Sequence, residues 1–206
     1  MFNLLKRSRL FCLIAITLLM LGNAQANPLN ALFHQTSDPV SGNPKGKVTV
    51  VEFFDYQCSH CIDMVPVITN ILQKNPSVRV VFKEFPIRGP LSERASRAAL
   101  AANLQGKYWP LHHAMLTSNA PLTDAVIFKL AKENGIDVDK LIVSMNSKAI
   151  SKELDATQRL AQTLNISGTP AFFIGPTNAK QTSDVIFVLG QMDEKQLQQL
   201  IDKNTP

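Results

Sequence analysis

Residues 48–61 of the chain are Val-Thr-Val-Val-Glu-Phe-Phe-Asp-Tyr-Gln-Cys-Ser-His-Cys. The first eight are mostly β-branched and aromatic, which is typical of a strand buried at the centre of a sheet. The pair Cys58 and Cys61 then opens a segment with apolar residues at helical spacing, in which Pro66 is expected to cause a kink. Residues 78–85 form a second predicted strand. Strand, helix and strand together predict a βαβ unit with two parallel strands.

A mainly helical segment follows this unit, from residue 91 to residue 165. Four helix starts are expected there, from residues suited to capping a helix N-terminus: Ser92, Thr123, Asp137 and a position near Ser151. Strands return at residues 171–174 and 185–189. A last helix is expected after Asp193, because Gln196 three residues later completes a capping box. This order predicts an α/β fold with a four-stranded mixed sheet, helices on both faces and an inserted helical subdomain.

The N-terminus has the pattern of a secretory signal peptide over residues 1–26. Three basic residues precede an apolar run that ends before the small-residue cleavage site Ala24-Gln25-Ala26. The run has about 12 residues, fewer than the ~20 that span a bilayer, so we expect cleavage before Asn27 and export of the mature chain. Residues 27–47 then form a polar lead segment, too short for a separate domain.

Composition narrows the class of protein. The chain has 206 residues, of which 45% are hydrophobic and 18% charged, which excludes collagen-like and disordered classes. Its formal net charge is +5, but three of its 21 basic residues lie in the predicted signal peptide. The remaining 18 basic and 16 acidic residues give +2, so no nucleic-acid partner is expected.

The mature chain would keep two cysteines, Cys58 and Cys61, at C-x-x-C spacing. A zinc site needs four ligands and the histidines are scattered, so no metal is expected. A disulfide between such close positions closes too small a ring to hold distant parts of a fold together. In an oxidising compartment, the pair is therefore expected to be a redox centre with no other cofactor.

Several motifs together resemble the DsbA family of periplasmic thiol:disulfide oxidoreductases. They are Glu52, Cys58-Ser59-His60-Cys61, Pro66, Phe85-Pro86-Ile87, Tyr108-Trp109 and Gly168-Thr169-Pro170 before residues 171–174. The resemblance implies a thioredoxin-like fold, with the thioredoxin-like domain in residues 48–90 and 166–206. The helical subdomain would occupy residues 91–165.

The resemblance also implies roles for the matching residues. Cys58 would be the exposed nucleophile, Cys61 the buried resolving cysteine, and Thr169-Pro170 a cis-proline loop that faces them and binds substrate. Glu52 would lie beneath the disulfide and assist proton transfer to Cys61. On pattern alone, Glu52 could equally lie at the wet edge of its strand. Lys83 could be its partner or a solvated lysine.

The position of Cys58 suits thiol chemistry, because a helix N-terminus favours the thiolate that attacks disulfides. A favourable helix terminus contributes up to ~2 kcal/mol, which would lower a thiol pKa from ~8.5 to about 7. A more acidic thiol needs further donors or charge, and His60 between the cysteines is the natural candidate. Tyr108, Trp109, His112 and His113, close together at one predicted helix start, are assigned to core or surface packing.

The expected function is a dithiol oxidase that introduces disulfides into exported, unfolded proteins through Cys58 and Cys61. The resemblance implies reoxidation by a quinone-linked membrane partner of the DsbB type, and a monomer is expected. An isomerase or reductase of the same fold is the first alternative, because Thr169 replaces the valine of the best-known family members. A peptide-binding chaperone with dispensable cysteines is the second.

Overall fold

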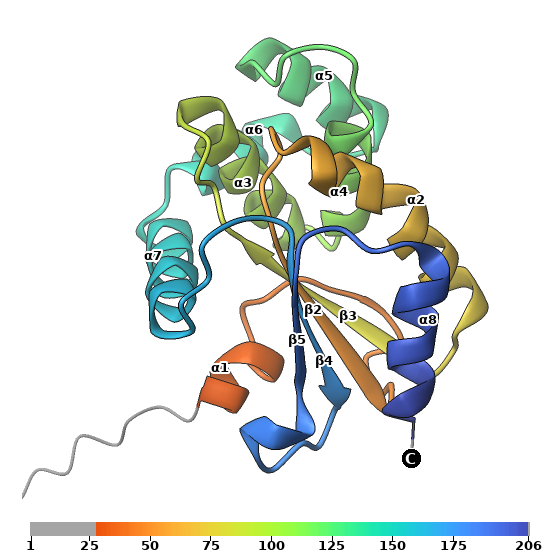
Figure 1. The fold of residues 1–206 in the computed structure, drawn as a ribbon. Coiled ribbons are helices and arrows are strands. Elements are labelled where there is room, and N and C mark those ends of the chain that lie inside the picture. The colour runs from red at the N-terminus through yellow and green to blue at the C-terminus, as the bar shows by residue number, and fades with distance from the viewer. Residues whose placement is uncertain (1–27, 206) are drawn as a thin grey trace, which may run out of the picture.

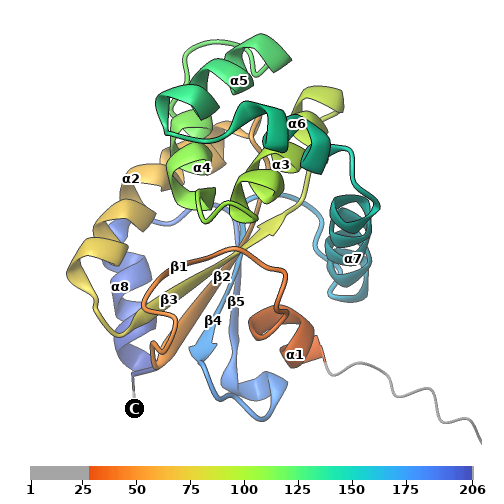
Figure 2. The same cartoon turned by 180° about the vertical axis from the view of Figure 1, so that it is seen from behind.

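The computed structural model describes residues 28–205, which form a mixed sheet with helices on both faces (Figures 1 and 2). The sheet order is β1-β3-β2-β4-β5, with β2 parallel to β3 and the other neighbours antiparallel. The strands are β1 (Val40–Gly42), β2 (Val48–Phe54), β3 (Val78–Glu84), β4 (Ala171–Pro176) and β5 (Ile186–Leu189). The predicted α/β class and the βαβ unit are confirmed. The predicted signal peptide lies outside the described residues.

The sheet has five strands where the sequence predicted four. The extra strand, β1, and the short helix α1 (Pro28–Phe33) both lie in the segment expected to be an irregular lead. β1 is three residues long and pairs antiparallel with β3. Gly42 ends it in the left-handed region at φ 81°, where a Cβ atom would stand 2.7 Å from the Val78 carbonyl oxygen. So short a strand has no periodicity that a sequence pattern could detect.

The larger helices are grouped around the sheet as Figures 1 and 2 show. One face is covered by α2 and α8 and the other by α1 and α7, while α3 to α6 gather over one end. The bounds are α2 (Ser59–Lys74), α3 (Pro90–Asn103), α4 (Tyr108–Leu116), α5 (Asp124–Glu133), α6 (Val138–Met145), α7 (Lys148–Thr163) and α8 (Glu194–Lys203). The helix α2 continues through Pro66. None of the helices in residues 28–205 is long and apolar enough to span a bilayer.

Two apolar cores lie on opposite faces of the sheet, because alternate strand residues point to opposite sides. Val50 and Phe54 of β2 belong to the core under α2, whereas Val51 and Phe53 belong to the core under α1 and α7. The same alternation places the polar strand residues. Glu52 lies on the α2 face with its neighbours Val50 and Phe54.

Two helix starts differ from the prediction. Ser92 does not cap α3, which begins at Pro90 after Gly89 at φ 99°. Proline is favoured in the first turn of a helix, and the Ser92 hydroxyl is buried against Asp55 instead. The helix expected near Ser151 begins at Lys148, capped by Ser147. The predicted capping by Asp137 and by Asp193 with Gln196 is confirmed.

Candidate active site

Cys58 and Cys61 lie at the start of α2, directly after the central strand β2. Cys58 occupies the N-cap position with extended backbone angles, and its carbonyl oxygen accepts the amide hydrogens of Cys61 and Ile62 at 3.0 Å. Both residues are free thiols, so the structure represents the reduced form. The Cys58 side chain projects at the end of the helix where backbone N–H groups lack intrahelical partners.

Cys58 is fully buried, whereas an exposed nucleophile was expected. Two groups far away in the sequence lie against its sulfur. The Sγ atom is 3.3 Å from the carbonyl oxygen of Thr169, to which the thiol donates, and 3.9 Å from Nη2 of Arg88. The loop before β4 and the loop after β3 thus both contact the sulfur at the start of α2.

The two thiols have opposite pKa shifts. Burial by itself raises the pKa of Cys58, but the hydrogen-bonding side chains of Thr169 and Cys61 and the charge of Arg88 lower it by more, so its pKa lies below the ordinary value. Burial and the nearby Glu52 carboxyl raise the pKa of Cys61 far above its ordinary value. Cys58 is therefore the thiol that ionises first, and Cys61 is the one that holds its proton.

The loop before β4 brings Thr169 and Pro170 to Cys58, and the peptide bond between them is cis. The Pro170 carbonyl oxygen accepts the Gly190 amide hydrogen at 2.8 Å. The Thr169 hydroxyl is buried and, among residues 28–205, has no hydrogen-bond partner while Cys58 is a thiol. When Cys58 ionises, this hydroxyl is available to donate to the thiolate.

His60 is exposed, and its ring contacts the loop between β5 and α8. Its Nδ1 atom lies 2.6 Å from Oε1 of Gln191 and 3.8 Å from a carboxylate oxygen of Asp63. The cation within hydrogen-bond range of Cys58 is Arg88, which the sequence analysis did not select. The expected effect of His60 on the Cys58 pKa stays a prediction.

Asp55 is a second residue that the sequence analysis missed. Its buried carboxylate accepts the amide hydrogens of Ile87 and Arg88 at 2.8 and 2.9 Å and that of Gln57 at 2.7 Å. It also accepts the Ser92 hydroxyl at 2.7 Å. The carboxylate thus joins the loop before Cys58 to the loop that carries Arg88. An acidic residue directly after a buried strand is the one signal that could have identified it.

Glu52 is buried beneath the cysteines, 4% exposed, and does not lie at a wet edge. Burial raises its pKa to about 8, with smaller contributions from Cys58 and Glu84. Glu52 and Cys61 line one cavity of about 10 Å³, close to the lower limit for one water molecule. Lys83 is not its partner: it stands opposite Phe53 on β2, points to the other face and pairs with Asp38.

The cavity also touches a buried polar cluster that was assigned to packing. Tyr56 and Tyr108 each donate a hydroxyl hydrogen to Glu84, at 3.1 and 2.9 Å, and Tyr56 also lies 3.0 Å from Nδ1 of His112. Burial raises the pKa of Glu84 to about 8 and lowers that of His112 to about 3. At neutral pH the imidazole is therefore uncharged.

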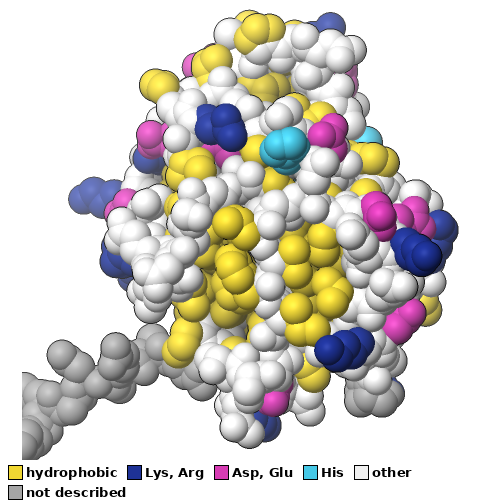
Figure 3. Space-filling model, in the orientation of Figure 1, with side chains coloured by type: hydrophobic (Ala, Val, Ile, Leu, Met, Phe, Trp, Pro, Cys, Tyr) yellow, Lys and Arg dark blue, Asp and Glu magenta, His cyan; other side chains and the backbone are white. Residues whose placement is uncertain are grey.

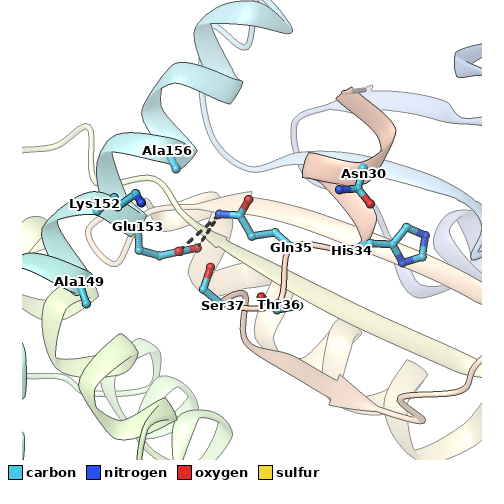
Figure 4. A pocket seen from close by; sticks show the side chains of 9 residues that line it. All are labelled: Asn30, His34, Gln35, Thr36, Ser37, Ala149, Lys152, Glu153 and Ala156. Atoms are coloured by element: carbon cyan, nitrogen blue, oxygen red, sulfur yellow. Dashed lines mark hydrogen bonds between the residues drawn. The ribbon is translucent and has the colours of Figure 1, made fainter. Parts of the chain in front are cut away.

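A cavity of about 560 Å³ lies away from the cysteines between the end of α1 and the helix α7 (Figure 4). In Figure 4, Gln35 points across it toward Glu153, 3.4 Å from the carboxylate. Within residues 28–205, no group of three or more His, Cys, Asp or Glu side chains could hold a metal ion.

Known proteins similar to this chain in sequence include antiporters and thiol:disulfide interchange proteins. A Na(+)/H(+) antiporter NhaA 3 of Salinispora tropica is 30% identical over 161 residues, covering 72% of this chain and 24% of the antiporter. The chain thus spans about a quarter of the length of this relative. The thiol:disulfide interchange protein DsbA of Bordetella parapertussis is 29% identical over 143 residues, covering 66% of this chain and 68% of that protein.

The fold comparison gives the same result. A thioredoxin-like oxidoreductase from Silicibacter pomeroyi superposes with a TM-score of 0.76 at 36% identity, covering 84% of this chain and 95% of the other. The thioredoxin-like fold expected from the sequence is confirmed. The model of the DSBA-like thioredoxin domain matches residues 49–202. The chain therefore belongs to the DsbA-like thioredoxin domain family of thiol:disulfide oxidoreductases.

Proposed function

We propose that the protein is a periplasmic dithiol oxidase that introduces disulfides into exported, unfolded proteins. The observation that carries the proposal is the opposite pKa shift of the two thiols, lowered at Cys58 and raised at Cys61. Stabilising the Cys58 thiolate stabilises the reduced protein, which makes the disulfide form a better oxidant. Cys58 is thereby also the better leaving group.

The reaction begins when a substrate thiolate attacks Sγ of Cys58 in the Cys58–Cys61 disulfide. The bond between the two cysteines breaks, and Cys61 leaves as a thiolate. Glu52, with a pKa of about 8, holds a proton at neutral pH and shares a cavity with Cys61, so it can supply the proton. A second substrate thiolate then attacks the substrate sulfur of the mixed disulfide and releases the Cys58 thiolate. The substrate dithiol loses two electrons, and the protein disulfide gains them.

Unfolded substrates need a surface that accepts apolar side chains without sequence selection. Figure 3 shows hydrophobic side chains on both sides of the β5 backbone, on the face formed by β5 and α8. Phe187 and Leu189 are about half exposed, and Val188, Met192 and Leu200 line a cavity of about 430 Å³ beside them. Gln191, the partner of His60, belongs to the same cavity, which makes this surface continuous with the active site.

A disulfide isomerase or reductase of the same fold is the second candidate. Thr169 favours it, because a threonine stands before the cis-proline where the best-known family members have valine. A peptide-binding chaperone is the third, and the apolar surface along β5 suits it. For the oxidase we propose a monomer that is reoxidised by a quinone-linked membrane partner of the DsbB type, with no nucleic-acid partner.

The deciding experiment is an equilibrium titration of the Cys58–Cys61 couple against glutathione, combined with oxidation of a reduced protein and repair of a scrambled one. An oxidase is expected to have an oxidising couple and to act faster on the reduced protein. A couple as reducing as cytosolic thioredoxin would contradict the proposal. Full activity of Cys58→Ser would support the chaperone, and faster repair than oxidation would support the isomerase.

A further inference from the structure

The loop between β3 and α3 brings Arg88 to the sulfur of Cys58, 30 residues earlier in the chain, with Nη2 at 3.9 Å. Both backbone polar groups of Arg88, the amide N–H and the carbonyl oxygen, form hydrogen bonds. The amide hydrogen donates to Asp55 at 2.9 Å, and the carbonyl oxygen accepts the side-chain amide of Gln57 at 3.0 Å. Both partners belong to the loop that leads into Cys58. Asp55 and Gln57, which precede Cys58 in the chain, thus hold Arg88 beside the Cys58 thiol.

The charge of Arg88 is not neutralised by a carboxylate. The ion pairs within residues 28–205 do not include it, whereas two arginines of the next helix, Arg94 and Arg97, pair with Asp124 and Glu93. An unpaired guanidinium next to a thiol favours its ionised form. The position of Arg88 therefore suits stabilisation of the Cys58 thiolate.

Arg88 is also an exposed neighbour of a buried sulfur. Cys58 is fully buried, whereas Arg88 is exposed and contacts its sulfur. Another contact of Sγ, the Thr169 carbonyl oxygen, belongs to the loop before β4. The groups that face Cys58 from elsewhere are Cys61 on α2 and Glu52 on β2, both of them buried.

We infer that Arg88 is a further catalytic residue, which stabilises the Cys58 thiolate by its charge and covers the sulfur until a substrate displaces it. The inference deepens the proposed function, because it assumes that Cys58 exchanges disulfides with the substrate. Arg88 acts in the step in which the mixed disulfide breaks. There the bond between Cys58 and the substrate sulfur is lost, the electron pair stays on Cys58, and the two substrate sulfurs become bonded.

The charge effect is tested by titrating the thiolate absorbance of Cys58 in Arg88→Gln and Arg88→Lys. A unit charge about 4 Å away in a water-like medium changes a pKa by ~0.7. We expect Arg88→Gln to raise the Cys58 pKa by about 0.5 to 1, a threefold to tenfold change in the ionisation constant, and Arg88→Lys to retain most of the effect.

The covering role is tested by alkylation at a pH where Cys58 is fully ionised. There, the rate no longer depends on the pKa, so it reports access to the sulfur. We expect Arg88→Ala to increase the rate constant for a bulky maleimide several-fold more than that for iodoacetamide. Arg94→Gln is the matched control, because Arg94 pairs with Asp124 and should leave the Cys58 pKa and both rates unchanged.

An unchanged Cys58 pKa in Arg88→Gln would overturn the charge role, and an unchanged ratio of the two alkylation rates in Arg88→Ala would overturn the cover. Neither measurement needs a protein substrate. A failure of this inference is therefore distinguishable from a failure of the proposed oxidase, which would appear in the wild-type glutathione titration. Far-UV circular dichroism checks that each variant is folded.

Discussion

At the scale of single residues, the reactivity of the site depends on small groups next to two sulfurs. Cys58 and Cys61 are three positions apart and both are buried, yet their pKa values shift in opposite directions. The difference comes from the neighbours, since hydrogen bonds and Arg88 stabilise one thiolate while the Glu52 carboxyl opposes the other. Single substitutions can remove each of these neighbouring groups in turn.

Thr169→Val removes a hydroxyl and keeps the shape of the side chain. The hydroxyl has no partner in the thiol form, so its loss should matter mainly when Cys58 is ionised. We expect the Cys58 pKa to rise and the couple to become more reducing, measured by thiolate absorbance and by the glutathione titration. Thr163→Val, on the surface of α7, is the control. An unchanged pKa would mean that the hydroxyl does not reach the thiolate.

Glu52→Gln should change how the stability of the reduced protein depends on pH. The folded-state pKa of Glu52 is about 8, above its ordinary value of 4.5, so the folded protein binds the proton more tightly than the unfolded chain. Its contribution to stability is full below about pH 4.5 and is lost as the pH rises toward 8. We expect the variant to match wild type at pH 4 and to be more stable at pH 8 by up to roughly 4 kcal/mol.

Urea unfolding of the reduced protein at the two pH values measures this effect. Glu84, whose pKa is also about 8, keeps part of the wild-type slope in the variant. Glu133→Gln, on an exposed helix surface, should leave the pH dependence unchanged. Equal pH dependence in wild type and Glu52→Gln would show that Glu52 is not held protonated.

His60→Ala, which leaves neither charge nor donor, separates the two candidate cations. The ring of His60 is bonded to Gln191, whereas Arg88 contacts the sulfur of Cys58. If the helix-terminal histidine stabilises the thiolate as the sequence predicts, His60→Ala raises the Cys58 pKa and makes the couple more reducing. An unchanged pKa and reduction potential would defeat that prediction.

At the scale of elements, the Asp55 carboxylate connects the β2–α2 loop with the β3–α3 loop. It accepts four hydrogen bonds, two on each oxygen. In Asp55→Asn, an NH₂ group replaces one oxygen and cannot accept the bonds that the oxygen received. In the wild-type protein, the Asp55 side chain therefore links the loop that leads into Cys58 to the loop that carries Arg88.

We expect Asp55→Asn to lower the free energy of unfolding by about 3 kcal/mol, because buried donors lose a charged acceptor. It should also raise the Cys58 pKa by releasing Arg88. Urea unfolding and thiolate titration measure the two effects, with Asp155→Asn on the surface of α7 as the control. If Asp55→Asn is destabilised but its Cys58 pKa is unchanged, Asp55 does not position Arg88.

At the scale of the whole molecule, a buried ion pair joins the N-terminal segment to the sheet. Lys83 of β3 and Asp38 have side chains that are only 1% and 2% exposed, and Lys83 also donates to the Ala31 carbonyl oxygen at 2.7 Å. Burial raises the pKa of Asp38 to about 7, although Lys83 opposes this shift. The segment expected to be an irregular lead is therefore part of the fold.

Lys83→Met should lower the free energy of unfolding by roughly 3 to 5 kcal/mol, since it leaves Asp38 buried without its partner. The double variant Lys83→Met with Asp38→Leu should recover much of this loss, because no charge then remains buried. Urea unfolding measures both. Lys129→Met, which removes one side of an exposed pair, is expected to change stability by less than ~1 kcal/mol. Equal losses at Lys83 and Lys129 would contradict the structural role of the buried pair.

The sequence by itself determined the βαβ unit, the place of Cys58 and Cys61 at a helix start and the capping of α8. Periodicity and capping act between residues a few positions apart, so they are visible in the sequence. The strand β1, the pairing of Lys83 with Asp38 and the approach of Arg88 to Cys58 were decided only by the tertiary structure. They join residues 30 or more positions apart, or a segment too short to show a period, and depend on how the sheet faces and loops pack.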